Sequence, residues 1–340
     1  MRLERGDSYV IRQNIPLTGV SEYDDMVYGH ISVACEDMED NILLKSDGMP
    51  TYNFANVVDD HLMKINYVIR GSEYLSSTPK YNLLYDSFGW ERPNYIHLPP
   101  IMKDATRKLS KRYGDANFED FINKGYLSDA IVNYIALLGW SPKNDEEKFD
   151  FDRLIELFGL EGISKSSSIF DENKMRWLNA AYVKELSDEE FLAHATPFLD
   201  NSKVGGKYDY ALLCSLLKNR IEIFSDIPAL VDFLEEYDGV DPELYFNKKM
   251  KTDAAVAAAV LPLCIDAVNN CEWTDEGIYN AVSAVAEQNG YKKGQLFWCF
   301  RIAITGREST PGGAMEMALL IGKDRTLERL GAQAKILSNT

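Results

Sequence analysis

The chain has 340 residues, and 36 basic against 53 acidic residues leave a formal net charge of −17. At roughly 150 residues per domain, this length predicts two or three domains. A hydrophobic share of 46% excludes a disordered chain, a collagen and a small disulfide scaffold. The charge argues against general affinity for nucleic acid, because proteins that bind a polyanion usually carry a basic surface. Residues 103–112 depart from this balance, with five basic residues against one acid.

Neither a membrane span nor a disulfide framework is expected. No stretch approaches the roughly 18 apolar residues that a membrane helix needs, and no apolar segment follows the basic residues near Met1, as a signal peptide would require. The five cysteines are odd in number, widely spaced and without a CxxC pair, a pattern typical of reduced thiols. We therefore expect a cytoplasmic protein.

The first third of the chain is predicted to combine strands and helices. Residues 9–44 alternate β-rich segments with turn residues, which indicates short strands. The spacing of apolar residues predicts a helix over residues 55–63, and residues 67–69 read as a short buried strand. A second helix is predicted over residues 78–88.

An extended segment at residues 97–101 completes this region. Pro79 near the start of the second helix is tolerated, because the first helical turn does not use its N–H. The order strand, helix, strand, helix, strand over residues 50–101 is typical of a parallel α/β sheet.

Beyond residue 115 the apolar residues follow a helical period almost throughout. Glycine and proline residues separate the helical segments. Helices are predicted over residues 151–158, 188–195, 208–218, 229–236 and 274–288. The sequence therefore predicts an α/β domain followed by two helical units.

The first candidate site is the basic segment at residues 108–112, which reads Lys-Leu-Ser-Lys-Arg. It follows the last predicted strand, so it lies near the carboxyl ends of the strands. Two lysines on a loop there would neutralise the oxygens of a triphosphate, because phosphoryl chemistry gains mainly from positioned charge. A solvated basic loop is the alternative.

A second candidate site combines Tyr52, Asn56 and Arg70. Tyr52 is predicted to end a strand, Asn56 to lie in the first turn of the following helix, and Arg70 to end the next strand. Such side chains would meet at the carboxyl edge of the sheet, where an arginine fork suits a small molecule with a carboxylate. The alternative is that Asn56 caps its helix and Arg70 pairs with Asp59 or Asp60.

The other polar clusters of the sequence are weaker candidates for a catalytic or binding site. Residues 59–61 read Asp-Asp-His, but adjacent helical residues do not share a face, so no metal site is predicted. His30, His97 and His194 have no partners at ligand spacing and are expected to be structural. The lysines of residues 248–251 are either solvated or in contact with a nucleic-acid backbone.

Together these segments resemble bacterial glutamyl-tRNA synthetases, which are class I aminoacyl-tRNA synthetases. Residues 108–112 resemble that family's KMSKS loop. The matching blocks follow one another in order from about Tyr9 to the end, at residues 44–61, 68–79, 88–90, 108–112, 125–127, 138–142, 169–171, 176–179 and 301–306. The family's HIGH motif has no counterpart in this sequence, so the resemblance is to the C-terminal portion of such an enzyme.

The resemblance implies the second half of a Rossmann-type α/β catalytic domain, followed by all-α domains. The expected divisions are residues 1–115 for the partial catalytic domain, 116–190 for a helical stem-contact domain and 191–340 for a helical anticodon-binding domain. Glutaminyl enzymes end in β-barrels and the tRNA-modifying paralogues lack the anticodon module, so the helical pattern disfavours both.

The resemblance also implies roles for individual residues. Tyr52, Asn56 and Arg70 match positions that bind glutamate, with Arg70 on its side-chain carboxylate. Glu73 matches a residue on the ATP side of the pocket, and three residues of the basic loop would close over the phosphates as catalytic groups: Lys108, Ser110 and Lys111. ATP would arrive with Mg²⁺, so no protein metal ligand is required.

The implied reaction joins glutamate to tRNA(Glu), with tRNA(Gln) as a further substrate left open. The glutamate carboxylate attacks the α-phosphorus of ATP and releases pyrophosphate, and the terminal ribose hydroxyl of the tRNA then takes the glutamyl group. Arg220 and Arg301 are tRNA-contact candidates by location. The chain is expected to be a monomer that is inactive without the HIGH-motif half, and a non-catalytic tRNA-binding module is the alternative.

Overall fold

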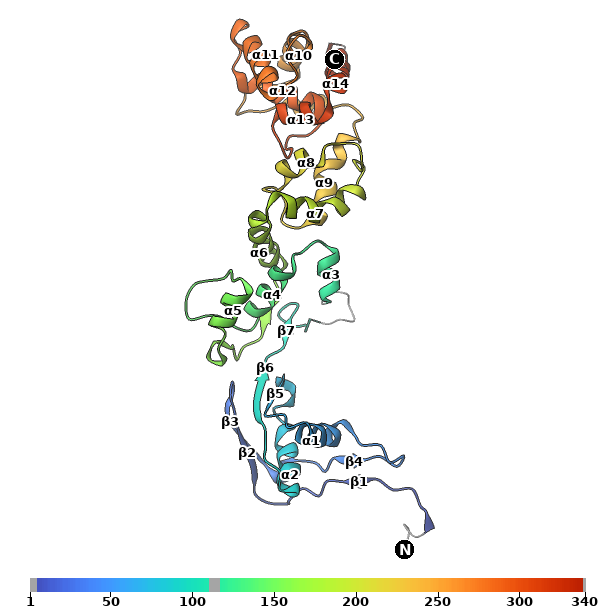
Figure 1. Ribbon diagram of the computed structural model, residues 1–340, viewed down its shortest axis with the longest axis vertical. Coiled ribbons are helices and arrows are strands. Elements are labelled where there is room, and N and C mark those ends of the chain that lie inside the picture. The colour runs from blue at the N-terminus through green and yellow to red at the C-terminus, as the bar shows by residue number, and fades with distance from the viewer. Residues whose placement is uncertain (1–4, 110–116, 339–340) are drawn as a thin grey trace. The chain divides into compact units, whose positions relative to one another are not determined.

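The computed structural model (Figure 1) describes residues 5–109 and 117–338. The chain divides into two compact units. Unit 1 comprises Met1–Asp120 and Ile131–Glu172, and unit 2 comprises Phe121–Ala130 and Asn173–Thr340. The three domains predicted from the sequence stay a prediction.

A four-stranded sheet organises the first part of unit 1, in the order β3-β2-β6-β5. Strands β2 and β3 form an antiparallel hairpin, whereas β6 pairs in parallel with both β2 and β5. Alternate residues of β2 are buried, namely Ser21, Tyr23 and Asp25, as expected for a strand with one covered face. The strands of this sheet are β2 (Val20–Asp25), β3 (Gly29–Ala34), β5 (Tyr67–Gly71) and β6 (Asn94–Leu98).

Helix α2 (Thr78–Phe88) connects β5 to β6 and confirms the predicted crossover between parallel strands. It has Pro79 in its first turn and ends at Gly89, whose φ of 68° suits a left-handed cap. The strand before α2 is β5, and the prediction that its residues 67–69 are buried is wrong. As an edge strand, β5 leaves Tyr67 47% and Ile69 60% exposed.

Helix α1 (Tyr52–Leu62) begins three residues earlier than predicted. The strand before it, β4 (Ile42–Leu44), does not join the parallel sheet but pairs antiparallel with β1 (Ile11–Arg12). The expected order of three parallel strands over residues 50–101 is therefore wrong at its first strand. The small core around α1 and α2 consists of Val57, Tyr81, Leu84 and Tyr85.

The rest of unit 1 is irregular around short elements. Strands β7 (Ile101–Met102) and β8 (Ser168–Ile169) pair in parallel, an exception to the helical pattern predicted beyond residue 115. Helices α3 (Phe118–Asn123) and α4 (Ser128–Leu137) each contribute residues to both units, whereas α5 (Phe151–Leu157) lies in unit 1.

The secondary-structure elements of unit 2 are all helices within its described residues, as predicted. Side-chain caps fix several helix starts: Ser187 and Glu190 form a capping box on α7, and Asp253 accepts the Val256 N–H at 2.8 Å on α10. The helices are α6 (Glu172–Glu185), α7 (Asp188–Asp200), α8 (Tyr210–Leu217), α9 (Ile227–Val231), α10 (Ala254–Asn269), α11 (Asp275–Gln288), α12 (Lys293–Thr305), α13 (Ala314–Ile321) and α14 (Lys323–Ser338).

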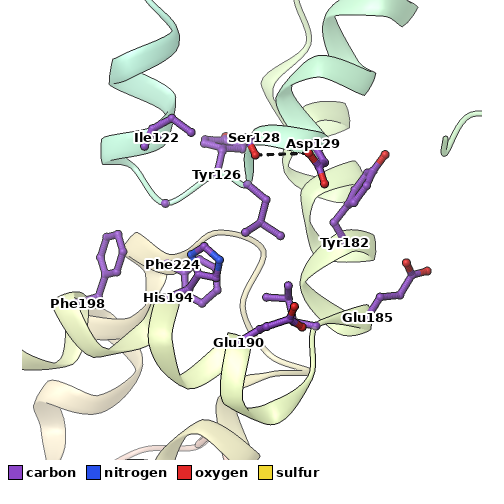
Figure 2. A pocket seen from close by; sticks show the side chains of 13 residues that line it. Ile122, Tyr126, Ser128, Asp129, Tyr182, Glu185, Glu190, His194, Phe198 and Phe224 are labelled. Carbon is purple, nitrogen blue, oxygen red and sulfur yellow. Dashed lines mark hydrogen bonds between the residues drawn. The ribbon is translucent and has the colours of Figure 1, made fainter. Parts of the chain in front are cut away.

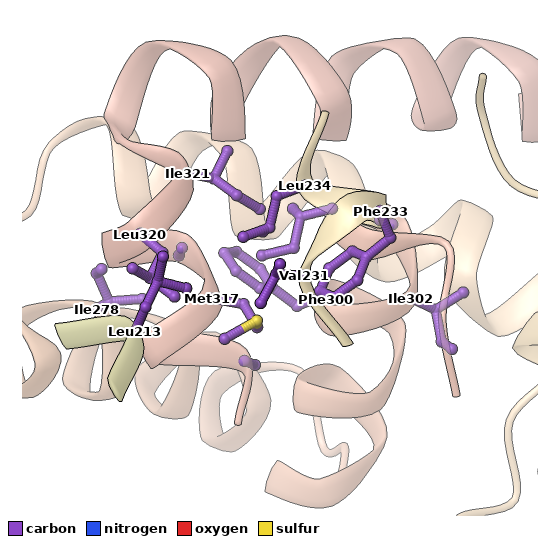
Figure 3. Packing of buried hydrophobic residues seen from close by; sticks show 14 of the residues in the cluster. Leu213, Val231, Phe233, Leu234, Ile278, Phe300, Ile302, Met317, Leu320 and Ile321 are labelled. Atoms are coloured by element: carbon purple, nitrogen blue, oxygen red, sulfur yellow. The ribbon is translucent and has the colours of Figure 1, made fainter. Parts of the chain in front are cut away.

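The core of unit 2 is extensive and apolar (Figure 3). Val231, Phe300 and Met317 pack there with exposed fractions of 1% or less. Each such side chain contributes about 1.5–3 kcal/mol through burial, so this core stabilises the helices more than their local propensities do. In the described parts of the chain, none of the helices has the length and apolar character needed to cross a membrane.

Candidate functional site

Arg70, near the end of β5, lies among aromatic rings in unit 1. Its guanidinium carbon is 5.1 Å from the ring centre of Tyr74, 4.9 Å from that of Tyr81 and 5.6 Å from that of Tyr95. Cation–π attraction at these distances holds the guanidinium among the rings. Its Nη2 donates a hydrogen bond to Thr78 Oγ1 at 3.1 Å. Its Nε is buried and has no hydrogen-bond partner among the residues that the structure describes.

Tyr52 and Asn56 lie one turn apart on α1, so they share a helix face. The prediction that Tyr52 ends a strand is wrong, because it is the first residue of the helix, and Asn56 lies too far along the helix to cap it. The Tyr52 ring centre is 6.1 Å from that of Tyr74. The Nδ2 of Asn56 is buried, and a hydrogen bond from the Asn56 side chain acts to lower the pKa of Tyr81.

Two tyrosines join α1 to Arg70. Tyr74 contacts both Tyr52 and Arg70, and the Tyr81 hydroxyl donates to Asn53 Oδ1 at 2.8 Å while its ring faces Arg70. Burial raises the pKa of Tyr81, and the positive charge of Arg70 opposes this shift. The structure therefore gathers side chains from α1 and β5 around one aromatic cluster.

The acids that were expected to pair with Arg70 in the alternative interpretation do not hold it. Within the described residues, the side-chain hydrogen bond of Arg70 goes to Thr78 rather than to Asp59 or Asp60. Burial raises the pKa of Asp60, and the Arg70 charge acts against that shift from a distance. Arg70 thus keeps donors that no acid occupies.

A buried polar chain behind Arg70 was missed by sequence reasoning. Asp25 Oδ2 lies 2.6 Å from His97 Nδ1, and His97 Nε2 lies 3.2 Å from Thr78 Oγ1. The side chains of Asp25 and His97 are both inaccessible to solvent. The prediction of a structural His97 overlooked this contact, because 72 residues separate the two partners and only the pairing of β2 with β6 brings them together.

The basic loop is described only at its start. Lys108 is exposed and follows a short hairpin, in which Lys103 N donates to Arg107 O at 2.8 Å. Hydrogen bonds from Thr106 and Arg107 hold the pKa of the Asp104 carboxyl well below its usual range, which fixes the turn. Two of the predicted catalytic residues, Ser110 and Lys111, lie outside the described residues.

Glu73, expected on the ATP side of the pocket, is exposed in the short 3-10 helix Ser72–Tyr74. A Cβ atom placed on Gly71 would lie 2.1 Å from the Glu73 carboxylate. Glycine at position 71 therefore leaves room for that carboxylate beside the end of β5. The contacts described for Lys108 do not include Glu73 or Arg70 within residues 5–109 and 117–338.

The two arginines proposed for tRNA contact lie in different surroundings in unit 2. Arg220 is exposed just beyond α8. Arg301, on α12, donates to the Glu308 carbonyl at 2.7 Å and lies 5.1 Å from the Trp298 ring centre. Burial lowers the pKa of Arg301. The buried Nε of Arg301 has no hydrogen-bond partner among the described residues, and the contacts described here do not join Arg301 to Arg220. A tRNA contact at either arginine stays a prediction.

The lysines of residues 248–251 lie on a tight turn of unit 2. Backbone hydrogen bonds between Asn247 and Thr252 close this turn, and Lys251 adopts a φ of 56°. Gln295 Nε2 donates to the Lys251 carbonyl at 3.0 Å, which fastens the turn to the start of α12, where Lys292 is also exposed. Within the described part of the chain, the side chains of these lysines have no ion-pair partner.

Sequence reasoning also missed a pocket of about 540 Å³ in unit 2 (Figure 2). Phe198 and Phe224 contribute apolar surface to it, while its polar lining includes Asp129, Glu190 and His194. These acids would repel phosphate groups, which argues against an RNA backbone in this pocket. Among the described residues, no cluster of acids, histidines and cysteines could hold a metal ion.

Comparison with known proteins identifies the family. Residues 1–177 match a family model described as "tRNA synthetases class I (E and Q), catalytic domain", and residues 190–334 match an "Anticodon binding domain" model. A glutamate–tRNA ligase of Clostridium acetobutylicum is 48% identical over 330 residues, which cover 97% of this chain and 68% of the relative. The chain belongs to the glutamate–tRNA ligase family.

Other glutamate–tRNA ligases extend this similarity. The relative from Clostridium kluyveri is 51% identical over 95% of this chain and 66% of its own length. A crystal structure of the ligase from Elizabethkingia meningosepticum, in complex with its amino acid, has a TM-score of 0.87 at 30% identity and covers 99% of this chain and 70% of that one. The chain spans about two thirds of the length of the curated relatives that it matches.

Membership of the glutamate–tRNA ligase family confirms the class I synthetase resemblance and its enzyme class. The α/β region followed by helices agrees with the fold class predicted from the sequence. The anticodon-binding match covers residues 190–334, which lie within unit 2 and include most of its helices. Substrate-binding roles for single residues are a separate question, which depends on the geometry around Arg70.

Proposed function

We propose that this chain carries the glutamate-binding site of a glutamate–tRNA ligase, at Tyr52, Asn56 and Arg70. One observation carries the proposal: within the described residues, Arg70 Nε is a buried donor without an acceptor. Leaving such a group unpaired costs about 1–3 kcal/mol, so a ligand oxygen at this place would be stabilising.

The chemistry of this cluster favours a carboxylate. Arginine offers several N–H donors in a planar fork and has no hydrogen-bond acceptor. The three surrounding tyrosine rings carry no negative charge that would neutralise it. A carboxylate would pair with the Arg70 charge, whereas an amide would not. Arg70 is therefore assigned to the side-chain carboxylate of glutamate, with Tyr52 and Asn56 beside it.

The reaction uses ATP with Mg²⁺, in the cytoplasm. Glutamate's α-carboxylate would attack the α-phosphorus and release pyrophosphate, and the tRNA ribose hydroxyl would then take the glutamyl group. Lys108 is exposed at the start of the basic loop, where it would neutralise phosphate charge together with Ser110 and Lys111, with Glu73 on the ATP side. This chain's residues would orient the reactants, which is the main contribution of a protein to phosphoryl chemistry.

The helical unit would bind tRNA(Glu) or tRNA(Gln). The lysine turn at residues 248–251 and the neighbouring Lys292 form a local basic surface on an acidic protein, and such patches bind phosphate in a salt-sensitive way. Arg220 adds an exposed cation, and Arg301 would be a second tRNA contact.

Two assays test this proposal and its alternative. Glutamate-dependent ATP–pyrophosphate exchange measures amino-acid activation, and a filter-binding titration at several salt concentrations measures tRNA affinity. Glutamate affinity together with tRNA binding supports the ligase portion, and exchange by this chain without the HIGH-motif half is expected to be weak or absent. Binding of tRNA without exchange or glutamate affinity supports a non-catalytic tRNA-binding module instead. If neither glutamate nor tRNA binds at low salt, both functions are wrong for this chain.

A further inference from the structure

Three buried residues connect the interior of unit 1 to Arg70. They are Asp25, His97 and Thr78, with exposed fractions of 3% or less. The Asp25 carboxylate contacts His97 Nδ1 at 2.6 Å, His97 Nε2 contacts the Thr78 hydroxyl at 3.2 Å, and that hydroxyl accepts from Arg70 Nη2 at 3.1 Å. We call this series of contacts the Asp25–Arg70 relay.

The far end of the relay is rigid. Asp25 Oδ1 accepts backbone N–H groups from Val27 at 3.0 Å and from Tyr28 at 2.8 Å, and Oδ2 accepts the backbone N–H of His97 at 3.1 Å. The carboxylate therefore cannot turn away from the His97 ring without leaving buried N–H groups unpaired, which is costly.

His97 connects the fixed Asp25 carboxylate to Thr78. Burial lowers the pKa of His97, although the hydrogen bond to Asp25 opposes the shift. His97 Nδ1 faces Asp25 Oδ2 and its Nε2 faces Thr78 Oγ1. The Thr78 hydroxyl donates its one hydrogen to the Tyr74 carbonyl at 2.9 Å, and its oxygen accepts from Arg70.

The relay fixes the orientation of the Arg70 guanidinium, which its aromatic neighbours do not fix. Cation–π attraction to Tyr74, Tyr81 and Tyr95 holds the guanidinium in place but permits rotation in its plane. The hydrogen bond to Thr78 is directional. The buried Nε–H has no acceptor among the described residues, so it stays available to a ligand.

We infer that Asp25, His97 and Thr78 are positioning residues, which fix the Arg70 guanidinium so that this site selects a carboxylate over an amide. The inference rests on the proposed role of Arg70 in glutamate binding. It predicts that losing the Thr78 hydroxyl weakens glutamate binding much more than glutamine binding, because only the carboxylate depends on the orientation of the fork.

The test compares Thr78→Val, which keeps the shape of the side chain, with Thr78→Ser, which keeps the hydroxyl. Calorimetric titration of the full chain measures the dissociation constants for glutamate and glutamine, and the ¹⁵N NMR signal of Arg70 Nε–H, assigned with Arg70→Lys, reports the guanidinium itself. We expect Thr78→Val to weaken glutamate binding about tenfold, with a change below twofold for glutamine, and to shift the Nε–H signal. Thr78→Ser should stay within twofold of the unaltered chain.

Asp25→Asn tests the relay from its far end and replaces Thr78→Val if that variant does not fold. It should weaken glutamate binding, and the double variant Asp25→Asn with Thr78→Val should be no weaker than Thr78→Val alone within about twofold, because both changes break the same series of contacts. Additive effects would indicate general loosening of the fold and overturn the inference.

Arg70→Ala separates the inference from the proposed function. If Arg70→Ala abolishes glutamate binding while Thr78→Val leaves it unchanged, the relay is wrong and the site stands. If Arg70→Ala binds glutamate normally, the proposed site is wrong, and the Nε–H signal in the two Thr78 variants still decides whether the relay orients Arg70. An unchanged signal in Thr78→Val overturns the relay.

Discussion

Gly125 and Phe224 lie so close together that only a glycine fits opposite the phenylalanine. A Cβ atom placed on Gly125 would stand 2.6 Å from the Phe224 Cβ, and the glycine has a φ of +82°. The Phe224 N–H donates to the Gly125 carbonyl at 3.2 Å. Phe224 itself is 1% exposed, so this contact ties the turn before α4 to the core of unit 2.

Gly125→Ala should therefore destabilise unit 2 strongly. The left-handed backbone costs about 1–2 kcal/mol for an alanine, and the collision with Phe224 adds about 1–3 kcal/mol. Gly206→Ala is the matched control, since Gly206 has a φ of +67° but no atom within 4 Å in the described residues. Urea denaturation followed by circular dichroism measures both. Equal losses for the two variants would show that the contact with Phe224 contributes nothing.

Phe300→Ala should lower the unfolding free energy by about 3–5 kcal/mol. Phe300 lies on α12 with no exposed surface, so the substitution leaves a cavity in the core shown in Figure 3. Phe246→Ala serves as control, because Phe246 is 66% exposed and its loss should change stability by no more than about 0.5 kcal/mol. Similar urea midpoints for the two variants would contradict the packing described for unit 2.

Glu235 should make unit 2 sensitive to acid. Burial raises the pKa of Glu235, but hydrogen bonds from Lys207, Tyr208 and Arg325 outweigh it and lower the pKa to about 2. A carboxyl with a depressed pKa stabilises the fold above its unfolded pKa of about 4.3 and loses that contribution as the pH falls towards 2.

Glu235→Gln should accordingly cost about 1.5–3 kcal/mol at pH 7, and much less at pH 2.5, where the unaltered carboxyl is itself becoming protonated. Urea midpoints of both proteins at the two pH values measure the difference. A difference that stays constant between pH 7 and pH 2.5 would mean that the ionised carboxylate does not stabilise the helices.

Charge reversal at Lys248 and Lys249 should weaken tRNA binding and flatten its salt dependence. Each lost phosphate contact reduces the slope of log affinity against log salt by about 0.7–0.9. Lys335→Glu, an exposed lysine on α14, is the control for a general charge effect. Filter binding at 50 to 200 mM salt gives the slopes, because phosphate contacts change affinity by orders of magnitude over this range. The same slope for the unaltered chain, the charge-reversal variant and Lys335→Glu would exclude the lysine turn from the tRNA surface.

The sequence predicted those parts of the fold that depend on local patterns. Helix α2 begins and ends at the predicted residues, with Pro79 in its first turn, and the helical character of unit 2 followed from periodicity. The predicted strand before α1 was assigned to the wrong sheet, since β4 pairs with β1 and strand pairing depends on contacts between segments far apart in the chain.

The same distinction applies to the candidate site. Tyr52, Asn56 and Arg70 stood out because their residue types follow predicted elements and match a family pattern. Asp25 and Thr78 carried no such signal, because an aspartate at a strand end and a threonine at a helix start are ordinary there. Their meaning appears only when the sheet places Asp25 beside His97, 72 residues away.

The binding of glutamate at Arg70 is tested most directly by calorimetric titration of the amino acid into the full chain and into Arg70→Ala. A hydrogen bond to a charged group contributes about 1.5–3 kcal/mol, so Arg70→Ala should weaken glutamate binding at least roughly tenfold. The control is Arg12→Ala, at an exposed arginine of the same unit, which should change glutamate binding less than twofold. If Arg70→Ala binds glutamate as tightly as the unaltered chain, or if the unaltered chain binds none, the site described here does not hold glutamate.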